Sequence, residues 1–435
     1  MKLFRRIATV ALFIALSAMF SLSLAQNLNT SNLSSSPYNR YGYGRLGTLG
    51  NSVTRSMGDV GIAVRSNQFT TLANPASLTA IDTLTMIFTV GLDAQFGGYK
   101  EDEASTHKWD AGFSGMSFQM PLWRNFAMSL SLSPYSMVGY YYGTSDKQAI
   151  QSPVISHDTL SYASTHTGVG GINHFMMGIG WRPFRTKTQE MNLGVNVGWL
   201  FGTIEHSGVL TTSTQANNTY IDYRATARGL SLTLGAHYTC RLNATSSLTL
   251  GAIYSPQLNM NISSESNKFS TDTITTKDKF RSGIKTPARY GVGLTYSVAR
   301  KLILTGEYEM SKWSEVAGLN TDMVCQEGIF NDSYRMALGA EYLPKSMTNN
   351  FFKACRYHAG VSYKTSYLKV NDKELRELGA NLGVSMPINK RSSLDLGVGY
   401  SSLQPEGGSM VKENYLTINV GLTFNEMMFF RNMLR

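Results

Sequence analysis

The sequence predicts an all-β protein: a transmembrane antiparallel β-barrel of about 14 strands with an N-terminal hatch, or plug, inside its lumen. Three observations predict this class. A short apolar leader opens the chain, most of the remainder alternates apolar and polar residues, and no later run of 18 apolar residues occurs. The composition has 40 Gly, 23 Tyr, 20 Phe, 11 Pro and 16% charged residues. Such a balance is typical of a β-rich protein.

Residues 1–25 are expected to be a secretory signal peptide. Three basic residues precede an uncharged apolar run, and Ser23-Leu24-Ala25 has the small residues that suit a cut after Ala25. A single-pass anchor is the alternative, but a run of about 14 residues is short against the ~20 needed to span a bilayer. The leader therefore predicts export, and no cysteine follows the cut to carry a lipid.

Residues 26–82 are predicted to form an N-terminal lead and hatch. The lead is rich in Asn, Ser and Thr, and it then brings Tyr38, Tyr41 and Tyr43 together without a helix or strand period. A disordered arm is one interpretation. A plug is the other, because clustered aromatic side chains are costly to expose to water and a lumen offers them packing. The family resemblance described below favours the plug.

The hatch is expected to end within residues 56–78, SMGDVGIAVRSNQFTTLANPASL. Small residues in this stretch suit close packing, and its Asn-Pro step predicts a turn, because proline fixes its own φ and biases the preceding residue away from helix. The predicted hatch-motif residues are Gly58, Gly61, Asn74, Pro75 and Ala76.

Residues 83–425 are predicted to form the barrel, and residues 426–435 a short periplasmic tail. Apolar residues occupy every second position of about fourteen segments, each long enough to cross a membrane at barrel tilt. The segments are 86–92, 116–120, 126–132, 175–181, 193–199, 230–238, 248–254, 290–296, 302–308, 334–338, 357–363, 378–384, 394–400 and 416–424.

Alternation alone does not say which face is inside, since a soluble sandwich also alternates. The leader, the even strand count and the charged alternate positions favour a barrel with a polar lumen. Glu307 and Glu309 share one strand face, about 7 Å apart. A paired-carboxylate enzyme is one interpretation of them, but carboxylates that brace a lumen are preferred. The predicted lumen polar residues are Arg65, Glu307, Glu309 and Arg335, with Arg65 paired to a carboxylate or holding an anionic head group.

The connections alternate between short and long. Short joins are expected to face the periplasm and long polar joins the outside, where barrels of this kind capture ligands or contact partners. The predicted outer loops are 145–164, 207–218, 263–286 and 314–332.

No catalytic residue, metal site or cofactor is predicted, and the protein is not expected to be an enzyme. Its seven His show no HExxH or Cys/His ligand spacing, and neither a G-x-S-x-G nor a phosphate-binding loop occurs. The net charge of +10 is scattered rather than clustered with aromatics, so no nucleic acid partner is expected. Cys240, Cys325 and Cys355 are too few for a disulfide framework, although one pair is possible.

Several stretches resemble the FadL-type family of outer membrane transporters for long-chain fatty acids and other hydrophobic compounds. The hatch ending in Asn-Pro-Ala is similar to the family's hatch, and residues 286–316, TPARYGVGLTYSVARKLILTGEYEMSKWSEV, resemble a family hairpin. SSLTLGAIYSPQLNMNIS and YLTINVGLTFNE resemble its strands. The family has a kinked third strand that opens the wall laterally. Ser133 and Pro134 are the matching positions here, unless the strand simply ends at the proline.

The resemblance implies an outer membrane channel for passive uptake of hydrophobic molecules, with a hatch-gated pocket and a lateral exit. Its partners are expected to be outer membrane lipid and a small hydrophobic ligand. The alternative is a non-transporting accessory barrel of a larger secretion or assembly complex, whose partners are other outer membrane proteins. A transporter needs a continuous apolar pocket against the hatch, whereas a subunit can fill that space with paired charges.

Overall fold

The computed structural model describes residues 35–149, 159–212, 218–270, 273–299, 301–316, 330–344, 350–389, 391–407 and 410–427. The predicted signal peptide and most of the predicted tail lie outside these ranges. No helix in the described ranges is long and apolar enough to cross a membrane.

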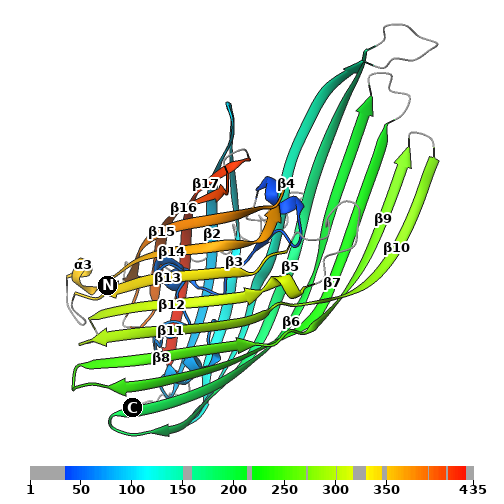
Figure 1. Ribbon diagram of the computed structural model, residues 1–435. Coiled ribbons are helices and arrows are strands. Elements are labelled where there is room, and N and C mark those ends of the chain that lie inside the picture. Colours follow the sequence, from blue (N-terminus) through cyan, green and yellow to red (C-terminus); the bar gives the residue numbers. More distant parts are fainter. Residues whose placement is uncertain are drawn as a thin grey trace, which may run out of the picture.

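Fourteen antiparallel strands form a closed ring (Figure 1), in agreement with the predicted number. Each strand pairs with the next along the chain, except that β8 pairs directly with β11, and β17 closes the ring by pairing with β2. The ring strands are β2 (Thr85–Glu101), β3 (Ala104–Trp123), β4 (Phe126–Ala149), β5 (Thr159–Arg185), β6 (Gln189–Thr212), β7 (Thr219–Arg241), β8 (Ser246–Ser255), β11 (Ala288–Val298), β12 (Leu302–Lys312), β13 (Ser333–Tyr342), β14 (Arg356–Val370), β15 (Lys373–Pro387), β16 (Ser393–Pro405) and β17 (Lys412–Met427).

The barrel is apolar outside and polar inside. Outward side chains such as Leu230, Leu338 and Leu382 are 59–66% exposed, while lumen side chains such as Gln119 and Asn192 are at most 1% exposed. A soluble sandwich has the opposite arrangement, so this sandwich interpretation is wrong and the exterior suits lipid. Six aromatic side chains of the kind that concentrates at membrane interfaces are exposed on the outer face: Trp181, Trp199, Tyr254, Tyr296, Tyr342 and Tyr400.

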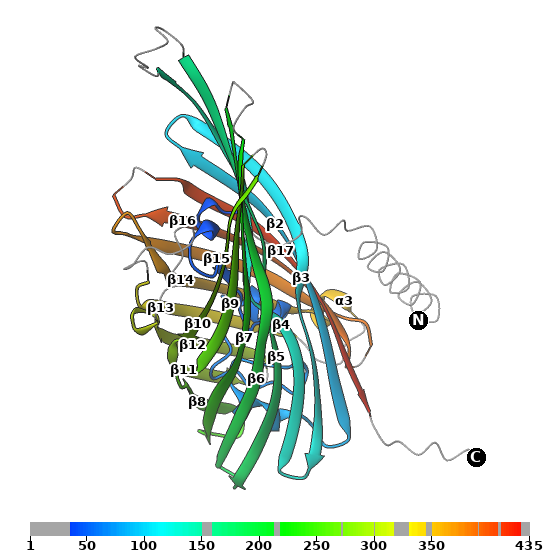
Figure 2. The ribbon, with the colours of Figure 1, turned by 90° about the vertical axis from the view of Figure 1, so that its right-hand side faces the viewer.

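One side of the wall is much taller than the other (Figures 1 and 2). Strands β4 to β7 continue beyond the ring, and a hairpin of β9 (Asn259–Ser270) and β10 (Thr273–Lys285) extends this side by pairing β9 with the upper half of β7. The segment 263–286, predicted as a long polar outer loop, is therefore mostly β-hairpin. The polar strands of this extension lack the apolar outer face by which the spanning segments were recognised.

The N-terminal segment lies inside the ring, as expected for a plug. It contains the 3-10 helix η1 (Pro37–Arg40), the two-residue strand β1 (Arg45–Leu46), the short helix α2 (Ser52–Ser56) and the 3-10 helix η2 (Pro75–Ala80). Tyr38 and Tyr43 are 7% and 1% exposed, so the disordered-arm interpretation is wrong for the described part of the lead.

The wall has a seam between β3 and β4. These strands pair only from Met116 to Trp123 on β3, opposite Phe126 to Leu132 on β4. Beyond that point, toward the end with long connections, β3 continues against β2 and β4 continues against β5. The plug strand β1 pairs with β4 at Ser136 and Met137, so the plug occupies part of this free edge.

Candidate functional site

The Asn-Pro-Ala motif fastens the end of the plug to the wall. The Asn74 side chain accepts a hydrogen bond from Ala76 N and donates to Ile62 O at 2.7 Å. It also donates to two wall carbonyls, those of Ala236 and Ala252, each at 3.3 Å. Pro75 begins η2, where its missing N–H costs no helical hydrogen bond. The motif thus joins two plug segments to β7 and β8.

Glu307 of β12 fastens the middle of the plug. Its carboxylate accepts hydrogen bonds from Gly61 N at 2.8 Å and Ile62 N at 2.9 Å, and it pairs with Arg335 of β13. Arg335 also donates to Asp59 O at 2.8 Å. Three of the predicted lumen residues, Glu307, Glu309 and Arg335, therefore come together, and Glu307 and Arg335 hold plug backbone.

The two predicted hatch glycines have different reasons for being glycine. Gly58 has φ +79°, a left-handed conformation that favours glycine, and a Cβ there would lie 2.8 Å from Val361 O. A Cβ on Gly61 would lie 2.9 Å from the Ala73 Cβ, so Gly61 lets two plug segments approach closely.

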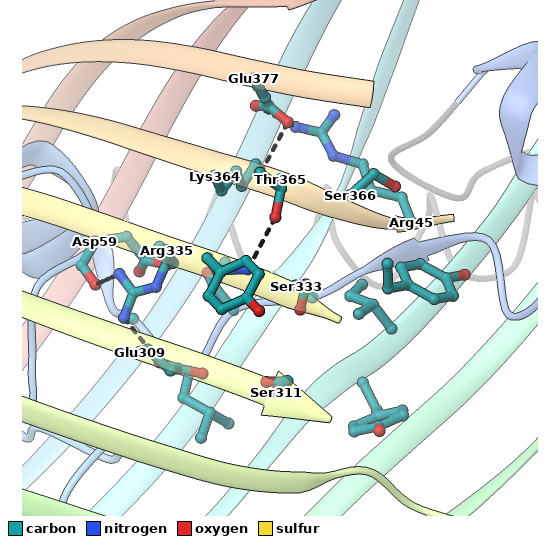
Figure 3. Close-up of a pocket in the computed structure, with 18 of the residues that line it drawn as sticks. Arg45, Asp59, Glu309, Ser311, Ser333, Arg335, Lys364, Thr365, Ser366 and Glu377 are labelled. Carbon is teal, nitrogen blue, oxygen red and sulfur yellow. Dashed lines mark hydrogen bonds and ion pairs between the residues drawn. The ribbon is translucent and has the colours of Figure 1, made fainter. Parts of the chain in front are cut away.

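A cavity of about 250 Å³ lies between the plug and the wall (Figure 3). Its lining carries four basic side chains and four acidic ones, and Figure 3 shows Arg45, Glu309, Arg335, Lys364 and Glu377 converging on this space. The ion pairs include Lys364–Glu377 at 2.9 Å, Arg335–Glu309 at 3.0 Å and Arg45–Glu377 at 3.6 Å. The remaining charged residues of the lining are Asp59, Arg289 and Glu413.

An aromatic cluster covers the cavity toward the end with long connections. Tyr43 of the plug stacks on Phe330 with ring centroids 6.0 Å apart and lies 5.8 Å from Trp313. Tyr367 lies 4.5 Å from Trp313, and its hydroxyl donates to Gly44 O at 2.6 Å. The plug is thus part of the roof of the cavity.

Glycines on the lumen face bring the plug backbone against the wall. A Cβ added at any of ten positions, one on each of ten strands, would lie within 3.0 Å of a plug atom. At Gly360 it would lie 2.0 Å from the carbonyl carbon of Met57, and at Gly194 2.3 Å from that of Pro75. We call these positions the glycine belt: Gly180, Gly194, Gly235, Gly251, Gly293, Gly339, Gly360, Gly383, Gly397 and Gly421.

Arg65 takes the predicted pairing role. Its guanidinium lies 2.7 Å from the carboxylate of Glu190 on β6, and Arg182 lies 3.1 Å from the same carboxylate. Arg55 of α2 likewise pairs with Asp93 of β2. The two arginines attach the plug to two different strands.

Ser133 and Pro134 lie directly beyond the last residue of β4 that pairs with β3. A bulge follows between Pro134 and Ser136, and β4 then continues to Ala149. The interpretation that the strand ends at the proline is therefore wrong. Gly47 N of the plug donates to the carbonyl of the bulged Tyr135 at 2.8 Å, so the plug fills the position predicted for a lateral gate.

Across the described ranges, no group of three or more His, Cys, Asp and Glu side chains is placed to hold a metal ion. Cys240 and Cys355 are free thiols. Cys325 lies outside the described residues.

Sequence reasoning missed three parts of this site. The glycine belt was visible as glycines at alternate strand positions, but their partners were not. Three charged residues of the cavity also stand at alternate strand positions, as other charged lumen residues do: Arg289, Lys364 and Glu377. For the aromatic cluster around Tyr43 that covers the cavity, the only indication in the sequence was the grouping of three tyrosines near the start of the plug.

Comparisons with known proteins agree with the fold. The Ralstonia pickettii toluene transporter TbuX is 14% identical with a TM-score of 0.53, covering 86% of this chain and 97% of its own. A Pseudomonas aeruginosa FadL homologue is 11% identical with a TM-score of 0.56, covering 88% and 99%. At such low identity these likenesses show the fold alone.

A search of curated proteins finds no match. The BamG family model, in contrast, matches residues 4–434, nearly the whole chain. Because this match spans nearly the whole chain, the chain belongs to the BamG family.

Proposed function

We propose that this protein is a non-transporting accessory barrel of the machinery that assembles outer membrane barrels. Membership of the BamG family supports this role, and the FadL-like fold supplies a membrane-embedded scaffold. On this proposal the plugged barrel is a fixed structural unit, and its partners are other outer membrane proteins.

The paired charges in the lumen carry the proposal. A channel for hydrophobic molecules needs a continuous apolar surface along its path, because burying charged side chains against an apolar ligand leaves their solvation uncompensated. The lining of this cavity includes apolar side chains such as Leu46, Leu72 and Leu375, but four acidic and four basic side chains, several of which are ion-paired, interrupt it. Such a lining suits a braced, water-containing lumen.

The attachment of the plug supports the same role. Asn74, Glu307 and Arg65 bind it at three places, and the glycine belt brings it into close contact with ten strands of the wall. Opening a path for a ligand would break these buried interactions together. A fixed subunit does not need to break them.

Passive uptake of hydrophobic molecules, such as long-chain fatty acids, is the second candidate. The seam between β3 and β4 favours it, since a wall that separates at Pro134 offers a lateral exit if the plug strand β1 moves. This candidate requires the plug to leave the seam, whereas the accessory role requires it to stay.

The deciding experiment is to extract the protein from its native outer membrane in mild detergent and to measure the mass of the particle that contains it. A stoichiometric assembly with other outer membrane proteins is the expected result. A lone barrel of about 48 kDa or less carrying lipid-sized adducts would favour the channel instead. Depletion of the chain, followed by measurement of other barrels in the membrane and of fatty acid uptake, separates the two roles in cells.

A further inference from the structure

The periplasmic ends of β3 to β8 carry exposed basic residues beside exposed apolar ones. In barrels of this type the end with short turns faces the periplasm. Three successive short turns each contribute such a neighbouring pair, and all six residues are exposed: Trp123-Arg124, Phe184-Arg185 and Arg241-Leu242. Trp123, Phe184 and Leu242 are 76%, 41% and 57% exposed.

The three turns form one continuous surface. Arg182 N donates to Asn125 O at 2.9 Å, which joins the end of β5 to the β3–β4 turn. Arg241 N donates to Thr188 O at 2.7 Å, which joins the end of β7 to the β5–β6 turn. We call this surface the basic rim: Arg124, Arg185, Lys187 and Arg241 with their apolar neighbours.

Aromatic side chains place the basic rim at the membrane–water boundary. Phe126 stacks on Trp181 with ring centroids 6.2 Å apart, and Trp123 meets Phe126 edge-on at 6.4 Å. Aromatic residues concentrate where lipid head groups meet the hydrocarbon. Lys and Arg at this level extend along apolar surface and place their charges among head groups.

The charge of the basic rim is largely unbalanced. The residues of its three turns, 124–125, 186–188 and 242–245, include no Asp or Glu. Glu190 of β6 lies opposite Arg185 and pairs with it at 3.5 Å, but it already holds Arg65 and Arg182 toward the lumen. A phosphate monoester or diester is therefore the complementary group that this surface lacks.

We propose that the basic rim binds the phosphate of an anionic phospholipid in the inner leaflet, with the exposed Trp, Phe and Leu contacting the acyl chains. This site does not depend on the proposed assembly role. A lipid is favoured over an acidic protein segment because every turn joins its basic residue to an apolar one at the level of the aromatic girdle.

The test compares two triple variants of the full chain with equal charge changes. Arg124→Gln, Lys187→Gln and Arg241→Gln remove three of the four basic residues of the rim and keep the Arg185–Glu190 pair. Lys301→Gln, Lys353→Gln and Arg391→Gln remove three basic residues from the other periplasmic turns and serve as the control. Each protein is exchanged into equimolar phosphatidylcholine and phosphatidylglycerol, and bound lipid is measured by native mass spectrometry.

The unmodified chain is expected to retain phosphatidylglycerol preferentially. Each Lys or Arg near an anionic surface strengthens binding about five-fold, so the basic-rim variant should lose at least about ten-fold of this preference while the control keeps it. Equal losses in both variants, or no loss in either, would overturn the site. If the basic-rim variant instead keeps its lipid but leaves a smaller native assembly, the rim serves an acidic protein.

Two further measurements keep the result interpretable. Glycerol phosphate carries the head-group charge without acyl chains, and it is expected not to displace the bound lipid; displacement would identify a free-anion site and reject the lipid. If the triple variant fails to form a barrel, the single change Arg124→Gln is measured in the same mixture, with Lys301→Gln as its control.

Discussion

At the scale of single residues, the plug is held by buried side chains that bind its backbone. Glu307, 7% exposed, accepts two plug amides and pairs with Arg335, while Asn74 bonds two wall carbonyls. Buried charges are tolerated where such partners satisfy them, and removing one partner leaves the other uncompensated. These residues therefore connect the plug to the wall energetically as well as spatially.

Replacing Glu307 by Gln should destabilise the plugged barrel by roughly 3 kcal/mol. The change keeps the shape of the side chain but removes the charge that holds Arg335 and the amides of Gly61 and Ile62. The measurement is the midpoint of thermal unfolding. It is monitored by the difference in mobility between heated and unheated barrel on denaturing gels.

The matched control for this change is Arg376→Gln. Arg376 pairs with Glu406 at 2.9 Å, but their side chains are 47% and 54% exposed. An exposed pair contributes about 0–1 kcal/mol, so little change is expected. Equal effects of the two substitutions would contradict a structural role for the buried carboxylate.

At the scale of elements, the glycine belt sets the distance between plug and wall. Replacing Gly360 by Ala places a Cβ 2.0 Å from the Met57 carbonyl carbon, so the plug must shift. Overpacking of this kind costs about 1–3 kcal/mol. We expect a lower unfolding midpoint and faster proteolysis of the plug. At Gly98, where a Cβ would lie 3.5 Å from the nearest atom, alanine should have little effect on either measurement.

The contact between β1 and β4 tests whether the plug must move. Leu46 and Ser136 are register partners, and paired strand positions are close enough for a disulfide. In a chain whose natural cysteines are replaced, Leu46→Cys with Ser136→Cys should cross-link on oxidation and still complement a deletion strain. The single Leu46→Cys chain is the control.

A locked plug that abolishes complementation, with recovery on reduction, would mean that the seam opens in normal function. That outcome would support the channel and reject the fixed accessory barrel. It also separates the two candidates without any knowledge of the substrate.

At the scale of the whole molecule, the ring closes independently of the tall wall. β8 pairs with β11 over ten residues, so the β9–β10 hairpin is a branch that contacts β7 above this junction. Replacing residues 257–286 by a short Gly-Ser turn should therefore leave a closed, heat-resistant barrel. The unfolding midpoint should fall modestly, because Met260, Ile262 and Ile284 are buried in the extension. Loss of the compact barrel would contradict this arrangement of the strands.

Local patterns in the sequence predicted much of the ring. All fourteen alternating segments fall within ring strands, because a spanning strand must present apolar side chains to lipid at every second position. Where strands rise beyond the lipid, as in β9 and β10, this requirement disappears and so did the signal. The alternating segment 126–132 likewise covers only the first part of β4, which extends to Ala149.

The sequence by itself determined that this chain forms a plugged barrel with a polar lumen. The alternation of side chains along a strand, and the lipid or water that each face meets, are recorded in residues that are neighbours in the chain. Only the tertiary structure decided what the lumen does with its charges. Glu307 of β12 binds the amide of Gly61, which lies 246 residues earlier in the chain. Gly360, on the different strand β14, packs against Met57 of the plug. Such contacts depend on strand register and on closure of the ring. Both bring together residues whose contact cannot be predicted from their separation in the chain.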